Sequence, residues 1–157
     1  MSRLQTGGFV PLFEKLGQAI SGLEGFETNY LSIRGVEQSI FKELRRIVST
    51  RSRLSFDAFL DRELSVIDYG LPDFFGFSIQ NLDHRNLVKQ ALKKSIEKFE
   101  PRLKNLEISC WQKDHSKTSL FFEISGVILF EENLKKTTFL ISSDDYVSDE
   151  SQEEVMS

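Results

Sequence analysis

The sequence is poor in the residues that bind metals or form disulfides. Cys110 is the single cysteine among 157 residues, so no disulfide can form within the chain. The two histidines, His84 and His115, lie at ligand spacing neither from each other nor from Cys110. We therefore predict no metal site and no cofactor. A chain without disulfides also fits a reducing compartment such as the cytoplasm.

Long apolar runs and regions of strong positive charge are absent too. No stretch approaches the roughly 20 apolar residues that cross a bilayer, and no N-terminal segment joins a basic start to an apolar run. We therefore expect a cytoplasmic protein that is not inserted in a membrane. Residues 144–157 contain six acids and neither Lys nor Arg. Residues 1–143 are near neutral without a basic stripe, which argues against a nucleic-acid partner.

The catalytic motifs that the sequence approaches are incomplete. Ser39–Lys42 and Ser95–Lys98 match Ser-x-x-Lys, but the Lys-Thr-Gly and Ser-Asp-Asn motifs of the enzymes that use it are missing. Gly17 and Gly22 have the spacing of a phosphate-binding loop, but Leu23 stands where that loop needs lysine. These matches do not predict an enzyme.

The chain divides into three parts. Glycines interrupt residues 1–30, which we interpret as an N-terminal arm that orders on a partner; a floppy leader is the alternative. Residues 31–143 carry regular hydrophobic patterns and form the folded domain. Residues 144–157 are acidic and poor in apolar residues, so we predict a disordered tail.

Two helices are predicted in the first half of the domain. From Ile33 or Val36 to about Ser49, apolar residues recur on one helical face: Val36, Ile40, Phe41, Leu44, Ile47 and Val48. A second helix is predicted over His84–Phe99 with Asp83 as its N-cap. Its apolar stripe comprises Val88, Leu92, Ile96 and Phe99.

Three strands follow these helices. Leu106, Ile108 and Cys110 alternate with polar residues, Ser119–Phe130 is the longest strand, and Lys136–Ser142 is the last. A turn over residues 131–134 joins the last two. The order α-α-β-β-β predicts an α+β fold, with two main helices packed on a small antiparallel sheet of about three strands.

A proline marks the change from helix to sheet. Pro101 has no backbone N–H and disfavours the α-helical conformation at Glu100, so the second helix should end at about Phe99. In extended chain, Glu100 and Arg102 point to the same side. The pair is either an ordinary surface ion pair, a structural clasp, or a fixed pair presented to a partner. We expect it to be partly exposed in the isolated domain.

This elbow and an upstream turn together resemble one protein family. The turn reads Tyr69-Gly70-Leu71-Pro72-Asp73, in which Gly70 can adopt positive φ, and the elbow reads Glu100-Pro101-Arg102. Both are complete signature features of the Gp25-like family. This family includes the baseplate wedge subunit of contractile-tailed phages and the TssE subunit of type VI secretion systems. Ser49-Thr50-Arg51 departs at one position from the family's Asn-Thr-Arg. The resemblance covers roughly Val36–Ser142.

The resemblance implies a structural role in a baseplate docked on the inner membrane. The implied partners are larger wedge subunits like TssF and TssG, the sheath subunits and the spike hub. The turn and the elbow would form the wedge contact: Tyr69, Gly70, Leu71, Pro72, Asp73, Glu100, Pro101 and Arg102. An outer strand would offer its open edge to a sheath strand through Thr137, Thr138, Phe139, Leu140 and Ile141.

Two other functions remain open at this point. Some proteins of this fold have been described as lysozyme-like, which would make the chain a muralytic enzyme. The arginine beside Glu100 favours the charged carboxylate, whereas a general acid must hold a proton, so the pair argues against this function. The other alternative is an anti-adaptor regulator that shares the fold and the Glu-Pro-Arg elbow. The complete turn over residues 69–73 favours the baseplate branch.

Overall fold

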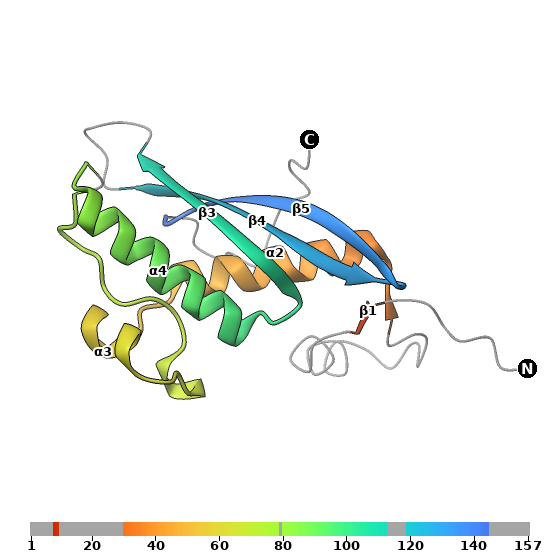
Figure 1. Cartoon of the computed structure of the whole chain (residues 1–157), viewed down its shortest axis with the longest axis horizontal. Coiled ribbons are helices and arrows are strands. Elements are labelled where there is room, and N and C mark those ends of the chain that lie inside the picture. The colour runs from red at the N-terminus through yellow and green to blue at the C-terminus, as the bar shows by residue number, and fades with distance from the viewer. Residues whose placement is uncertain (1–7, 10–29, 79, 113–118, 145–157) are drawn as a thin grey trace, which may run out of the picture.

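Two long helices cover one face of a three-stranded antiparallel sheet, which confirms the predicted α+β fold (Figure 1). The computed structural model describes residues 8–9, 30–78, 80–112 and 119–144. The predicted arm and tail lie almost entirely outside these residues and stay predictions. In chain order the elements are β1 (Gly8–Phe9), β2 (Tyr30–Leu31), α2 (Ile33–Ser49), α3 (Phe56–Asp61), the 3-10 helix η1 (Val66–Asp68), α4 (Leu82–Phe99), β3 (Leu103–Gln112), β4 (Leu120–Phe130) and β5 (Asn133–Ser142).

The helix α2 forms where the sequence predicts it. The Ser32 side chain accepts a hydrogen bond from the Gly35 N–H at 3.2 Å and caps the first turn. The predicted apolar face is buried except for Phe41, which is half-buried and packs against the core. The helix ends at Ser49, where Thr50 adopts an extended conformation.

The predicted N-cap of α4 is wrong by two residues. Asn81, not Asp83, caps the helix, because its side-chain oxygen accepts hydrogen bonds from the N–H groups of Asp83 and His84. Asp83 lies in the first turn, where its charge complements the helix dipole. The helix ends at Phe99 as predicted, and the Glu100 N–H closes its last turn on the Ile96 carbonyl at 2.8 Å.

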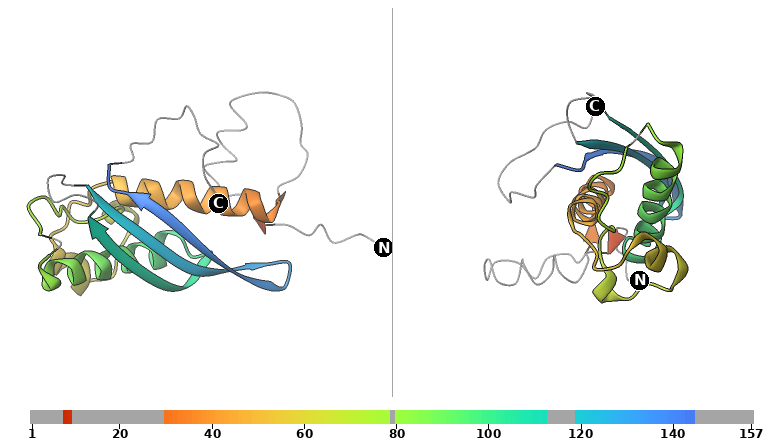
Figure 2. Two further views of the ribbon diagram at one scale, coloured as in Figure 1. Left: turned by 90° about the horizontal axis from the view of Figure 1, so that it is seen from above. Right: turned by 90° about the vertical axis from the view of Figure 1, so that its left-hand side faces the viewer.

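The sheet has the strand order β3-β4-β5, and both helices lie beneath it (Figure 2). Helix α4 packs on β3, and α2 packs on β5, where the Phe41 and Phe139 rings stack with centroids 6.3 Å apart. The core between the layers combines alternate strand residues with the apolar faces of both helices. None of the described helices has both the length and the apolar character needed to cross a membrane.

The loop between β4 and β5 is shorter than predicted. Only Glu131 and Glu132 form it, with φ of 48° and 65°, so β5 begins at Asn133 rather than Lys136. Two-residue hairpin loops usually need left-handed conformations of this kind, and Asn-Gly or Asp-Gly normally supply them. Glu-Glu carries no such signature, which is why the sequence did not reveal the tight turn.

The two outer strands differ in regularity. The β3–β4 pairing shifts register between Lys104 and Glu107, and Asn105 there has a φ of 52°. A Cβ on Gly126, in the facing part of β4, would lie 2.7 Å from the Leu103 side chain, so this close approach requires glycine. By contrast, β5 pairs with β4 over ten residues without any shift. Of the two edges, β5 is the regular one.

Candidate protein-binding site

The elbow at residues 100–102 contains a bidentate ion pair. The Arg102 Nε donates to the Glu100 Oε1 at 2.7 Å, and its Nη2 donates to Oε2 at 2.6 Å. The remaining terminal nitrogen, Nη1, donates to the Ser39 Oγ of α2 at 3.0 Å. The elbow is therefore held by a hydrogen bond to α2 as well as by its own ion pair.

This pair is more buried than we expected from the sequence. Glu100 is 1% exposed, whereas the Arg102 side chain is 24% exposed. The prediction of a partly exposed pair is thus wrong for Glu100, because Glu100 closes the end of α4 instead of lying in open extended chain. Pro101 between them is exposed. Only the proline and part of the arginine are accessible from outside.

The turn at residues 69–73 is fastened to both long helices. The Tyr69 hydroxyl donates to the Glu43 Oε1 of α2 at 2.6 Å, and its ring lies 5.0 Å from the Phe99 ring of α4, centroid to centroid. Burial, followed by the hydrogen bond to Glu43, raises the pKa of Tyr69 above its ordinary value. Because Phe99 precedes Glu100, this contact places the turn beside the elbow.

Gly70 makes the close approach between this turn and α2 possible. Its φ is +99°, and a Cβ there would lie 2.4 Å from the Thr50 carbonyl oxygen. That oxygen accepts a hydrogen bond from the Leu71 N–H at 3.0 Å, and the Ser95 hydroxyl of α4 donates to the Gly70 carbonyl at 2.8 Å. Gly70, Leu71 and Pro72 are buried and Asp73 is exposed. The two signature motifs thus form one rigid platform.

A buried carboxylate next to the turn was missed by the sequence reading. Asp68, at the end of η1, is fully buried and accepts hydrogen bonds from the Ser65 N–H at 2.9 Å and the Ser65 hydroxyl at 2.8 Å. Arg53 and Arg62 each lie 3.4 Å from it. The Ser65 backbone hydrogen bond is the largest cause that lowers the pKa of Asp68; the Ser65 hydroxyl and both arginines act in the same direction, and burial opposes them.

Two apolar side chains of the 3-10 helix η1, which Asp68 stabilises, are exposed to solvent. Val66 is 83% exposed and Ile67 is 68% exposed, although both precede a fully buried residue. A capping box between Ser65 and Asp68 holds this single turn. The pattern Ser65-x-x-Asp68 is only a weak sequence signal for a capping box, because aspartate stands where Glu or Gln is usual.

The described residues contain no arrangement typical of a metal or nucleophile site. No group of three or more His, Cys, Asp or Glu among them could hold a metal ion. Burial raises the pKa of the Cys110 thiol to about 11, which keeps it protonated and unreactive at neutral pH. The Nδ1 of His84 accepts the Ser78 N–H at 3.1 Å, a local contact at the start of α4.

The predicted docking strand has one side that faces away from β4. The Ser143 N–H donates to the Leu120 carbonyl at 2.8 Å, which identifies the alternate pairs that exchange hydrogen bonds along β4 and β5. Thr137, Phe139 and Ile141 therefore direct their backbone groups toward β4. The outward backbone groups without a hydrogen-bond partner among the described residues belong to Leu134, Lys136, Thr138 and Leu140.

The five docking residues predicted from the sequence therefore fall into two groups, which differ in burial and in the direction of their backbone groups. Phe139 and Ile141 bury their side chains in the core and pair with β4, and Thr137 is half-buried. Thr138 and Leu140 are exposed and present backbone groups outward. The edge extends back to Leu134, because β5 begins earlier than predicted.

Comparison with known proteins identifies the family. The model of the family described as "Baseplate wedge protein gp25" matches residues 34–133, more than half of the chain. The chain belongs to the gp25 baseplate wedge family. No curated protein and no solved structure matches significantly.

The matched range contains the whole platform and most of the sheet. Both signature motifs lie within residues 34–133, as do the polar partners Ser39 and Glu43 that hold them. Membership of the gp25 family supports a structural role in the baseplate of a contractile tail. The resemblance stated from the turn and the elbow is therefore confirmed at the level of the family.

We predict that Arg102→Ala destabilises the isolated protein strongly. Removal of the guanidinium strands the buried Glu100 carboxylate, a change that costs about 3–5 kcal/mol in comparable pairs. Urea unfolding followed by circular dichroism measures the loss. Lys93→Ala, at an exposed position of α4, is the control and should change stability by no more than about 0.5 kcal/mol.

A second variant distinguishes the cost of leaving the Glu100 charge unpaired from the cost of losing the packing contacts of the Arg102 side chain. Adding Glu100→Gln to Arg102→Ala removes the unpaired charge and should recover part of the stability. A loss below about 1 kcal/mol for the single variant would instead indicate an ordinary surface ion pair.

We predict a pH-dependent contribution from Asp68. Because its pKa in the folded state is lower than the ordinary value of 3.8, its charged form stabilises the fold above that pH. The stabilisation is lost as the pH falls below 3.8 and through the folded-state pKa. The stability difference between the wild-type protein and Asp68→Asn should stay constant from pH 7 to about pH 5 and narrow below 3.8.

Urea titrations across this pH range test the Asp68 prediction. Asp61→Asn makes the same change in net charge at an exposed position and serves as the control. A difference that widens as the pH falls would contradict the assigned direction.

Proposed function

We propose that this protein is the TssE-type wedge subunit of a type VI secretion baseplate. It would bind larger wedge subunits of the TssF and TssG kind, lie near the spike hub, and template the first ring of the sheath. It would act in the cytoplasm, in a baseplate docked on the inner membrane. Family membership supports the baseplate role, and the open β5 edge is the observation that carries the sheath-templating role.

The platform formed by the turn and the elbow supports the proposed wedge contact. Its accessible parts are Asp73, Pro101 and portions of Tyr69 and Arg102. Glu100, Gly70, Leu71 and Pro72 are buried and set the shape of this surface from beneath. The buried pair and the close glycine contact hold the surface rigid, so a partner would pay little entropy to fix it.

A structural role is also consistent with the environment of Glu100, the residue that would have to act as the general acid of a muralytic enzyme. Both carboxylate oxygens of Glu100 accept charge-assisted hydrogen bonds from Arg102, and the side chain is closed to solvent. A general acid must carry a proton and reach the glycosidic oxygen. We therefore infer that the protein is not a muralytic enzyme.

The choice between the two sheet edges rests on their geometry. A bulge at Lys104–Glu107 and the left-handed Asn105 distort β3, and such features protect an edge from pairing. On β5, the outward groups of Leu134 to Leu140 follow an unbroken register. Lys136 lies among them, and charged side chains of this kind discourage unspecific pairing of a free edge. A specific partner strand would extend the sheet at β5.

We predict that Leu140→Pro abolishes sheath nucleation and leaves the fold intact. Its N–H points away from β4, so proline removes one outward donor without breaking the β4–β5 ladder. Baseplates with this variant should assemble with the larger wedge subunits but carry no sheath in electron micrographs. Circular dichroism should show a folded protein.

A second substitution at the same position isolates the role of the backbone. Leu140→Thr keeps the N–H and removes the apolar side chain, which is 56% exposed, and should still support sheaths. Normal sheaths on Leu140→Pro baseplates would place the docking edge elsewhere.

A further inference from the structure

One side of α2 continues beyond the β5 edge. Phe41 stacks on Phe139, and the Glu37 carboxylate meets the Lys135 Nζ at 2.9 Å, so this helical face lies directly under β5. At 100° per residue, the next positions around the helix form a flank that extends past β5. We call it the α2 flank, and its residues are Arg34, Gln38, Phe41 and Arg45.

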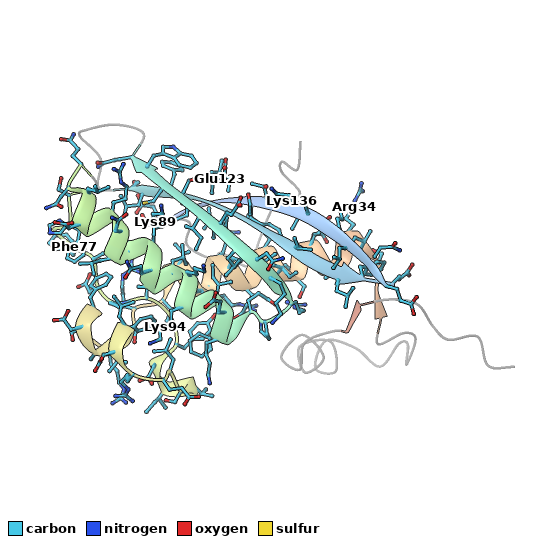
Figure 3. All side chains as sticks on the ribbon, in the orientation of Figure 1. Arg34, Phe77, Lys89, Lys94, Glu123 and Lys136 are labelled. Carbon is cyan, nitrogen blue, oxygen red and sulfur yellow. The ribbon has the colours of Figure 1, made fainter. Side chains whose placement is uncertain are left out.

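The α2 flank is positively charged. Arg34 and Arg45 supply two cations, and the Arg45 guanidinium lies 5.7 Å from the centre of the Phe41 ring. The nearest acid under the strand, Glu37, is buried and already paired with Lys135. Figure 3 labels Arg34 on α2 and Lys136 on β5; the Lys136 side chain lies 3.9 Å from the Glu107 carboxylate of β3, on the face of the sheet away from α2. The positive charge on this side of β5 therefore comes from α2 and not from Lys136.

A strand added to β5 would cover this flank. Neighbouring strands lie about 4.8 Å apart, and every second side chain of an added strand would point toward the helix layer. Those side chains would meet Phe41, which is only half-buried, and the two cations beside it. Like charges would be repelled there, and acidic ones attracted.

We propose that β5 accepts an acidic strand of the sheath subunit, with carboxylates turned toward Arg34 and Arg45 and an apolar side chain above Phe41. This inference rests on the proposed sheath-docking function and adds the chemistry of the partner. Backbone pairing provides affinity for any extended segment, whereas the α2 flank selects among segments by charge.

Charge reversal on the flank tests the proposal in the full-length protein. Arg34→Glu reverses the charge of an exposed flank residue and leaves Arg45 in place on Phe41. We expect at least a tenfold fall in the number of sheaths per baseplate, with baseplate assembly unchanged. Lys93→Glu makes the same change in net charge at an exposed position of α4, and should leave the sheath number unaltered.

The outcomes separate this proposal from the docking function beneath it. If Leu140→Pro abolishes sheaths and the flank reversal does not, β5 still docks the sheath but charge does not select the strand, and the proposal is overturned. If Leu140→Pro has no effect, the docking function itself fails.

The acidic residues 145–157 of this chain are a competing occupant of the α2 flank. If their removal raises the sheath number in the wild type but not in the flank variant, the tail occupies the flank, which also overturns the proposal.

Discussion

The buried ion pair between Glu100 and Arg102 is the constraint on which the rest of the structure depends. It lies where α4 ends and β3 is about to begin, and its third hydrogen bond reaches Ser39 of α2. Three elements are therefore fixed at one point. Because a buried carboxylate without its partner is strongly destabilising, any arrangement of these elements that separates Glu100 from Arg102 is disfavoured.

The same constraint positions the two surfaces that we assign to partners. Tyr69 contacts Phe99 one residue before the ion pair, so the turn and the elbow share one platform at this end of the molecule. At the β5 edge of the sheet, α2 lies beneath the strand and contacts it through Phe41 and Phe139. A contact with the wedge and a contact with the sheath would thus be joined by a rigid layer, as expected for a structural subunit.

Much of this architecture was predictable, and the failures have local physical causes. Apolar periodicity located α2 and α4, and Pro101 fixed the end of the second helix, because proline acts through the backbone and needs no tertiary partner. The sequence did not locate the helix cap at Asn81, because Asp83 two residues later is also a suitable N-cap residue. It did not locate the Glu131–Glu132 turn, because no glycine marks that turn. Ser39 and Glu43 could not be predicted as partners of the motifs, because those contacts depend on how the layers pack.

The central claim is that β5 gains a strand when the sheath assembles, and hydrogen exchange on purified baseplates tests it most directly. Backbone amides of Phe139 and Ile141 already face β4 and should be protected with or without sheath. Those of Leu134, Lys136, Thr138 and Leu140 face outward, and they should become protected only after sheath subunits are added. Unchanged exchange at these four amides in sheathed baseplates would contradict the account.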